Sequence, residues 1–215
     1  MKGMRWLPIV VAGLALVAGI WLSSTRLMTQ EQTPAAPRAL PTPSHAGTML
    51  VPPRELGDFA LTDTEGAPFT RQSLRGHWTL LAFGYTTCPD VCPTMLHTFV
   101  DIQKRLQGMK LSDAMPRFVF VSVDPERDDL VRLKGYLNYF SPTFLGATGP
   151  HPALQKITSQ LGILYQRVGQ DAGYLVDHSA TILLLDSQAR LKAVFSAPHQ
   201  PEVITGDLMG ILGKN

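Results

Sequence analysis

The sequence predicts an α/β domain built on a central sheet with helices on its flanks. Three apolar runs lack the alternation of half-exposed strands, which is typical of central strands covered on both faces. They span residues 79–85, 118–123 and 180–185. Between such runs, hydrophobic residues recur at intervals of three and four, the period of amphipathic helices. The 215 residues suit one medium domain with appendages rather than two ordinary domains.

The remaining elements follow in order along the chain. Residues 59–61 and 68–70 flank a turn at 63–66 and predict a small N-terminal β-hairpin. Residues 191–195 predict a strand that pairs with 180–185 across a loop of hairpin length. The helical spacing predicts helices over residues 95–106, 130–140, 154–161 and 204–211.

The N-terminus carries an apolar segment long enough to cross a bilayer. Twenty residues without a charged side chain separate Arg5 from Arg26, and about 20 helical residues span the roughly 30 Å of hydrocarbon. Tryptophans at its two ends favour the membrane interface, and the basic residues before it favour a cytoplasmic N-terminus. We therefore predict a cytoplasmic segment over residues 1–5 and a transmembrane anchor over residues 6–25.

A cleaved secretory signal is the alternative, because small residues at 17–19 offer a cleavage point. Residues 26–52 are rich in proline and predict an extended tether. Residues 53–215 then form the domain. Both interpretations place this domain in the periplasm or an equivalent extracytoplasmic space, which is oxidising.

Charge and cysteine content exclude several classes of protein. Nineteen Lys and Arg against seventeen Asp and Glu give a formal charge of +2. The positive excess lies before residue 51, so the domain lacks the basic surface of a nucleic-acid binder. Two cysteines are too few for a disulfide-rich scaffold, a four-cysteine zinc site or an iron–sulfur cluster. Their chemistry must be that of a pair.

Cys88 and Cys92 lie between a predicted buried strand and a predicted helix, in the run Cys-Pro-Asp-Val-Cys-Pro. Free amides and the dipole at a helix N-terminus stabilise a thiolate. If the segment is helical, residues four apart share a face, so both sulfurs can converge on one metal ion. The pair can also close a disulfide after a small backbone adjustment. A permanent disulfide that only stabilises the turn is less favoured, because closing so short a loop contributes little to stability.

His178 is the histidine best placed for chemistry among the six of the chain. It stands at the entrance of the apolar run 180–185, where a buried imidazole needs a partner or a metal. Asp177 is a candidate to orient its ring by accepting the second ring proton, although neighbouring strand residues point to opposite faces. Asp124 directly follows the strand 118–123 and is a candidate to support the same edge, because sites on such sheets gather at strand C-termini.

Four further residues have ordinary structural interpretations. His97 lies five positions after Cys92 and therefore faces a different side of the helix. The helical spacing of Met95 predicts core packing rather than a thioether ligand. Asp128 and Asp129 suit a turn and the first turn of a helix, where acidic side chains are favourable.

The donor set of two thiolates and one imidazole favours copper. Thiolate selects Cu(I) and imidazole suits both copper and zinc, whereas structural zinc usually takes four ligands. We therefore predict a copper site, with Cu(I) as the expected state and Cu(II) as a second one.

Three segments together resemble the Sco/SenC family of copper-binding assembly proteins. They are residues 87–94 (TCPDVCPT), 122–128 (SVDPERD) and 176–179 (VDHS). Their order, their spacings and the preceding anchor match the family over residues 55–213. The resemblance implies a thioredoxin-like fold with an N-terminal β-hairpin and one copper ion bound by Cys88, Cys92 and His178. It also implies a metallochaperone, rather than an enzyme, that helps to build the copper A centre of cytochrome c oxidase.

The resemblance also implies the partners of the chain. These are an apo cytochrome c oxidase subunit that carries the copper A site, a copper donor or thiol reductant, and the membrane through residues 6–25. No nucleic-acid partner is expected.

The same fold also serves thiol–disulfide exchange, which provides the main alternative function. A thiol–disulfide oxidoreductase would reduce target cysteines with Cys88 and Cys92 as its redox pair, joined by a disulfide when oxidised. Thioredoxin-type reductases usually have two residues between their cysteines and a cis-proline opposite, whereas here three intervene and the segment around His178 takes the facing position. Both departures favour metal binding. A redox or copper sensor that signals to a membrane partner is a third class, which the sequence does not separate from the first two.

Overall fold

The structure, a computed structural model, describes residues 47–109, 115–170 and 173–212. The predicted segment 1–5, the anchor 6–25 and the tether as far as residue 46 lie outside the described residues. In the described part of the chain, no helix combines the length and the apolar character needed to cross a membrane.

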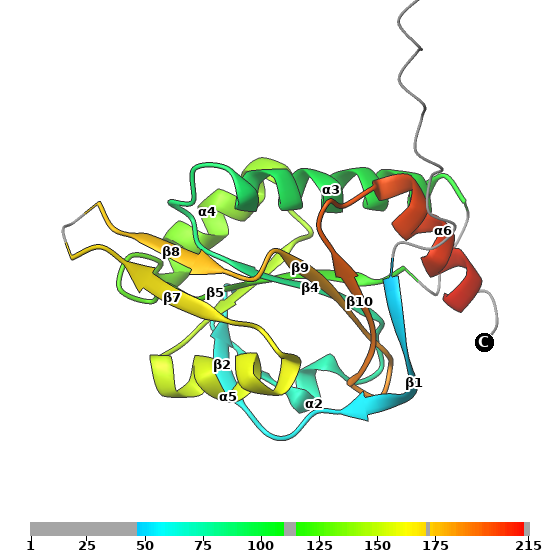
Figure 1. The fold of residues 1–215 in the computed structure, drawn as a ribbon, viewed down its shortest axis with the longest axis horizontal. Helices are drawn as coiled ribbons and strands as arrows, with labels where there is room; N and C mark the ends of the chain where they lie inside the picture. The colour runs from blue at the N-terminus through cyan, green and yellow to red at the C-terminus, as the bar shows by residue number, and fades with distance from the viewer. Residues whose placement is uncertain (1–46, 110–114, 171–172, 213–215) are drawn as a thin grey trace, which may run out of the picture. The chain divides into compact units, whose positions relative to one another are not determined.

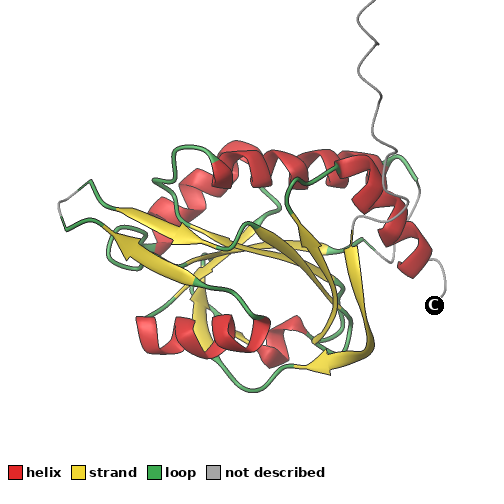
Figure 2. Cartoon of the chain, viewed as in Figure 1, coloured by secondary structure: helices red, strands yellow, loops and turns green. Residues whose placement is uncertain are grey.

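A mixed sheet of eight strands forms the centre of the described domain (Figures 1 and 2). In sheet order its strands are β1 (Gly47–Glu55), β10 (Arg190–Ser196), β9 (Thr181–Leu185), β4 (Thr79–Gly84), β5 (Arg117–Ser122), β6 (Leu145–Thr148), β2 (Ala60–Asp63) and β3 (Pro68–Thr70). β4 runs parallel to β5 and antiparallel to β9. The three apolar runs are therefore neighbouring central strands, as predicted.

Helices cover both faces of this sheet, which confirms the α/β class (Figure 1). One face carries α3 (Val91–Gln107), α4 (Leu130–Phe140) and α6 (Pro201–Leu212), and the other carries α2 (Arg71–Leu74) and α5 (His151–Leu161). All residues of β4 are buried between these layers, in keeping with its unbroken apolar sequence. The four helices predicted from hydrophobic spacing are all present.

Both predicted hairpins are confirmed. β2 and β3 pair antiparallel, with Leu61 opposite Phe69. The Asp63 carboxylate closes their turn by accepting the backbone N–H groups of Glu65 and Ala67 at 2.9 and 2.8 Å. β9 and β10 likewise pair antiparallel across their short loop.

Strand β1 corrects the predicted tether. Residues 47–52 were expected to lie in the tether 26–52, but they pair with β10 from Gly47 opposite Phe195 onwards. The prolines that suggest a tether are tolerated because β1 is an edge strand with an irregular register between Met49 and Arg54. An edge strand needs only one set of backbone hydrogen bonds, so proline is a weak argument against it.

A second sheet was not predicted. β7 (Tyr165–Val168) and β8 (Leu175–His178) form a two-stranded antiparallel hairpin separate from the main sheet. β7 contains no buried residue and β8 only Val176, so the apolar pattern that reveals a strand is missing here. This hairpin matters for function because its second strand ends at His178.

Candidate metal centre

The candidate site lies at the C-terminal ends of the parallel strands β4 and β5. The Val123 N–H donates to the Gly84 carbonyl at 2.9 Å, which keeps the two chains together just beyond the sheet. The chain then turns from β4 into α3 and carries both cysteines in this connection. The sheet thus supplies a rigid base for a loop with reactive side chains.

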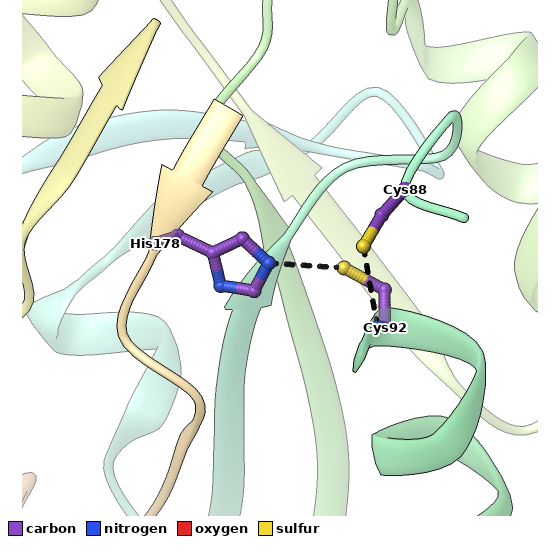
Figure 3. A group of neighbouring side chains, drawn as sticks. All are labelled: Cys88, Cys92 and His178. Atoms are coloured by element: carbon purple, nitrogen blue, oxygen red, sulfur yellow. Dashed lines mark hydrogen bonds between the residues drawn. The ribbon is translucent and has the colours of Figure 1, made fainter. Parts of the chain in front are cut away.

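Cys88 and Cys92 converge through the turn rather than through shared helical spacing. Cys88 precedes α3, which begins at Val91, whereas Cys92 lies within the first helical turn. The Cys88 Sγ accepts the Cys92 backbone N–H at 3.4 Å (Figure 3). The two sulfurs are neighbours, as predicted, although only Cys92 lies on the helix. A helix-terminal amide directed at Cys88 favours its thiolate form.

His178 completes a group of three donor side chains from distant parts of the chain (Figure 3). Its Nε2 lies 3.2 Å from the Cys92 Sγ. The Cys88 Sγ, the Cys92 Sγ and the donor nitrogen of His178 all lie within 4.8 Å of one another. Among the described residues, this is the one group of three His, Cys, Asp or Glu side chains arranged to hold a metal ion. His178 stands just before β9, at the entrance of the apolar strand as predicted, and it also ends β8, a strand that was not predicted.

The two cysteines differ sharply in environment. Cys92 is fully buried, whereas Cys88 and His178 are partly exposed. Hydrogen bonding to the Cys92 thiol, with further bonds to His178 and to backbone amides, outweighs desolvation and lowers the pKa of Cys88 to about 3. The same bond to Cys88, together with burial, raises the pKa of Cys92 far above its ordinary value. Both cysteines are free, so the pair consists of an accessible thiolate and a buried thiol.

Gly84 leaves room for the buried sulfur. A Cβ at this position would meet the Cys92 Sγ well inside van der Waals contact and the Phe120 Cζ at 2.7 Å. The thiol therefore packs directly on the backbone of β4. The absence of a side chain at Gly84 is a requirement of the site that no sequence pattern indicates.

Asp128 holds the loop that leads to Cys88, a role that its sequence context does not indicate. Its fully buried carboxylate accepts the Thr86 N–H at 2.8 Å, the Thr86 hydroxyl at 2.6 Å and the Ser122 hydroxyl at 2.6 Å. Arg132 donates to the Thr86 hydroxyl at 3.0 Å. The predicted capping role falls instead to Asp129 alone, which accepts the Arg132 N–H at 2.7 Å. A buried carboxylate with three donors fixes the turn two residues before Cys88.

Among the described residues, neither Asp124 nor Asp177 forms a hydrogen bond with the three donor side chains. Asp124 is buried and accepts hydrogen bonds from Arg127 and Tyr174. Asp177 is exposed, and the acceptor near the His178 Nδ1 is the Ser179 carbonyl at 3.3 Å. The backbone thus occupies the place expected for the Asp177 carboxylate, because successive residues of β8 point to opposite faces.

The other candidates that the structure describes have ordinary structural surroundings. Met95 is buried in the core, as its spacing predicts. His97 is exposed and packs edge-on against Phe140, with ring centroids 5.1 Å apart. His151 contacts Glu126, at 2.8 Å. The remaining histidines are His77, which contacts Arg117, His199, which contacts a backbone carbonyl, and His45, which lies outside the described residues.

Comparison with known proteins identifies relatives over nearly all of the described domain. The SCO1/SenC family model matches residues 48–213. An SCO2-like protein of Rickettsia felis is 36% identical over 157 residues, which cover 72% of this chain and 75% of that protein.

Two solved structures have the same fold. The copper-bound ScoI of Bradyrhizobium japonicum is 37% identical, with a TM-score of 0.63 over 72% of this chain and 97% of that one. The copper-bound ScoI of Arabidopsis thaliana is 28% identical, with a TM-score of 0.69 over 74% and 98%. The predicted thioredoxin-like α/β fold is therefore confirmed for the described domain, and the chain belongs to the SCO1/SenC family.

Proposed function

We propose that the chain is a membrane-anchored copper metallochaperone that assists assembly of the cytochrome c oxidase copper A centre. Cys88, Cys92 and His178 bind one copper ion, which is the cargo of the protein. The observation that carries this proposal is the convergence of two sulfurs and one imidazole nitrogen within 4.8 Å. Such a soft set suits Cu(I), and three donors are fewer than structural zinc usually takes. The two copper-bound structural relatives support the same metal.

The exposure of the donors suits transfer to a partner. Cys88 and His178 are partly open to solvent, whereas Cys92 is sealed beneath them. Ligands of an apo-oxidase subunit can therefore replace Cys88 and His178 one at a time while Cys92 retains the ion. Each exchange keeps the ion coordinated, so copper need not pass through solution.

Thiol–disulfide exchange is the second candidate, favoured by the contrast between the two cysteines. The Cys88 thiolate can attack one sulfur of a target disulfide and release the other as a thiolate. Cys92, after losing its proton, then attacks Cys88 and releases the second target thiolate. Two electrons pass to the target, and the chain is left with a Cys88–Cys92 disulfide that a thiol reductant must reduce. In this oxidised state the site cannot bind copper, because both thiolates are consumed.

A Cu(I) competition titration of the reduced full chain tests the proposal. The wild type should bind one equivalent, and Cys88→Ser, Cys92→Ser and His178→Ala should each bind more weakly. His97→Ala is the matched control, since that imidazole is exposed on α3 and lies outside the donor group. If His178→Ala binds copper as tightly as wild type and the reduced chain reduces a peptide disulfide efficiently, the oxidoreductase replaces the chaperone as the better function.

The location of the domain forms part of the same proposal. The uncharged segment 6–25, with basic residues before it, supports an anchor that leaves the domain in the periplasm or an equivalent space. The intact mass of the chain recovered from membranes distinguishes the two interpretations. A full-length mass after alkaline washing supports the anchor, and a mass that lacks the N-terminal segment supports a cleaved signal.

A further inference from the structure

The hairpin that carries His178 does not join the main sheet. β7 and β8 pair only with each other within the described residues. At the base of the hairpin, the Ser179 N–H donates to the Leu164 carbonyl at 2.9 Å, and the Leu164 N–H donates to the Ser179 hydroxyl at 3.0 Å. Tyr174 and Val176 pack against the hydrophobic core, but a two-stranded hairpin outside a larger sheet is only marginally stable by itself. The position of the imidazole therefore depends on a further, polar attachment to the domain.

Tyr174, directly before β8, provides that attachment. Its hydroxyl donates to the Asp124 carboxylate at 2.6 Å. Its backbone carbonyl accepts the Arg127 Nη1 at 2.8 Å, and the Arg127 guanidinium carbon lies 3.6 Å from the centre of the tyrosine ring. Arg127 Nε in turn donates to Asp124 at 2.5 Å. Arg127 thus holds both the backbone and the ring of one residue, and a buried carboxylate fixes the guanidinium itself.

Arg127 also packs against the ring of Tyr85. Its guanidinium carbon lies 5.5 Å from the centre of the Tyr85 ring. That ring stands edge-on to the His178 imidazole, with centroids 5.9 Å apart and planes at 87°. One guanidinium therefore packs against Tyr174 at the start of β8 and against the ring that contacts His178 at its end.

We propose that Arg127, fixed by Asp124, is a positioning residue for His178. It holds β8 through Tyr174 and confines the His178 imidazole through Tyr85, so that the Nε2 faces the Cys92 sulfur. This inference rests on the proposed function, in which His178 is a copper ligand. Lysine cannot replace Arg127, because one ammonium group cannot bond the carboxylate and the carbonyl while it stacks on the ring.

A double-mutant cycle on the full chain tests this role. Arg127→Gln should weaken Cu(I) binding about tenfold, as loss of an outer partner of a metal ligand usually does. On the His178→Ala background the same substitution should cause no further loss, because the ligand that it positions is gone. Lys134→Gln is the matched control. It removes one positive charge from α4, where Lys134 pairs with the exposed Glu65, and should leave copper binding unchanged.

A second readout needs no metal. In the copper-free protein, Arg127→Gln should increase amide hydrogen exchange at residues 165–168 and 175–178, and Lys134→Gln should not. Tyr174→Phe keeps the ring and removes only the hydrogen bond from the hydroxyl to Asp124. It should therefore weaken copper binding and increase hydrogen exchange, each by less than Arg127→Gln does. It also serves if Arg127→Gln fails to fold.

Two results would overturn the positioning role. One is that Arg127→Gln and Tyr174→Phe both bind copper with wild-type affinity. The other is that the loss of affinity caused by Arg127→Gln adds in full to the loss caused by His178→Ala. If His178→Ala itself binds copper normally, the proposed function fails, and the exchange experiment alone then judges whether Arg127 anchors the hairpin.

Discussion

The two neighbouring acids Asp128 and Asp129 should differ strongly in their contribution to stability, although they look alike in sequence. Asp128→Ala removes the acceptor of three hydrogen bonds, from two Thr86 groups and from the Ser122 hydroxyl. Bonds to a charged acceptor contribute about 1.5–3 kcal/mol each, but Thr86 is partly exposed and water can replace some of the loss. We expect a loss of about 3–5 kcal/mol in the free energy of unfolding, the range for breaking a buried charged group. At roughly 2–4 °C per kcal/mol, the Tm should fall by about 10 °C.

Asp129→Ala is the control for this measurement. The Asp129 side chain is exposed and accepts one hydrogen bond from the Arg132 N–H as the N-cap of α4. Loss of such a cap costs about 1 kcal/mol, so the Tm should fall by only about 3 °C. Thermal unfolding of the reduced, copper-free chain measures both variants. Equal decreases for the two substitutions would show that burial of the Asp128 carboxylate is not what holds the loop.

Two further predictions concern the cysteines. Gly84→Ala should displace the Cys92 sulfur or the Phe120 ring, so the affinity for copper should fall. Gly210→Ala is the control, because there is open space around Gly210, and it should leave the affinity unchanged. Unchanged copper binding by Gly84→Ala would contradict the tight packing of the Cys92 sulfur on β4. Cys88 should react with iodoacetamide at a rate that stays constant between about pH 5 and pH 8, because its lowered pKa, about 3, keeps it a thiolate throughout. Cys92 should stay unmodified in the native protein. An alkylation rate for Cys88 that rises about tenfold per pH unit, as expected for a thiol with an ordinary pKa, would show that the pKa is not lowered.

The sequence was most informative where a pattern is local. The unbroken apolar run of β4 is visible without the fold, and so is the four-residue spacing of Cys88 and Cys92. His178 could be selected because a histidine beside an apolar run needs a partner. Its actual partner lies 86 residues away, at Cys92, and only the sheet topology brings the two together.

The rest of the site depends on contacts that sequence spacing does not encode. Asp128 and Thr86 are separated by 42 residues, and Arg127 and Tyr174 by 47. The β7–β8 hairpin escaped prediction because its two strands contain a single buried residue, Val176, which leaves no apolar pattern to recognise. Burial separates a structural acid such as Asp128 from a surface cap such as Asp129, and burial is a property of the folded chain.

The most direct test of the central claim is X-ray absorption spectroscopy at the copper edge of the reduced chain loaded with one equivalent of Cu(I). Binding by Cys88, Cys92 and His178 predicts a first shell of two sulfurs and one imidazole nitrogen, and loss of the imidazole contribution in His178→Ala. A wild-type shell without an imidazole nitrogen, or an unchanged imidazole signal in His178→Ala, would contradict it.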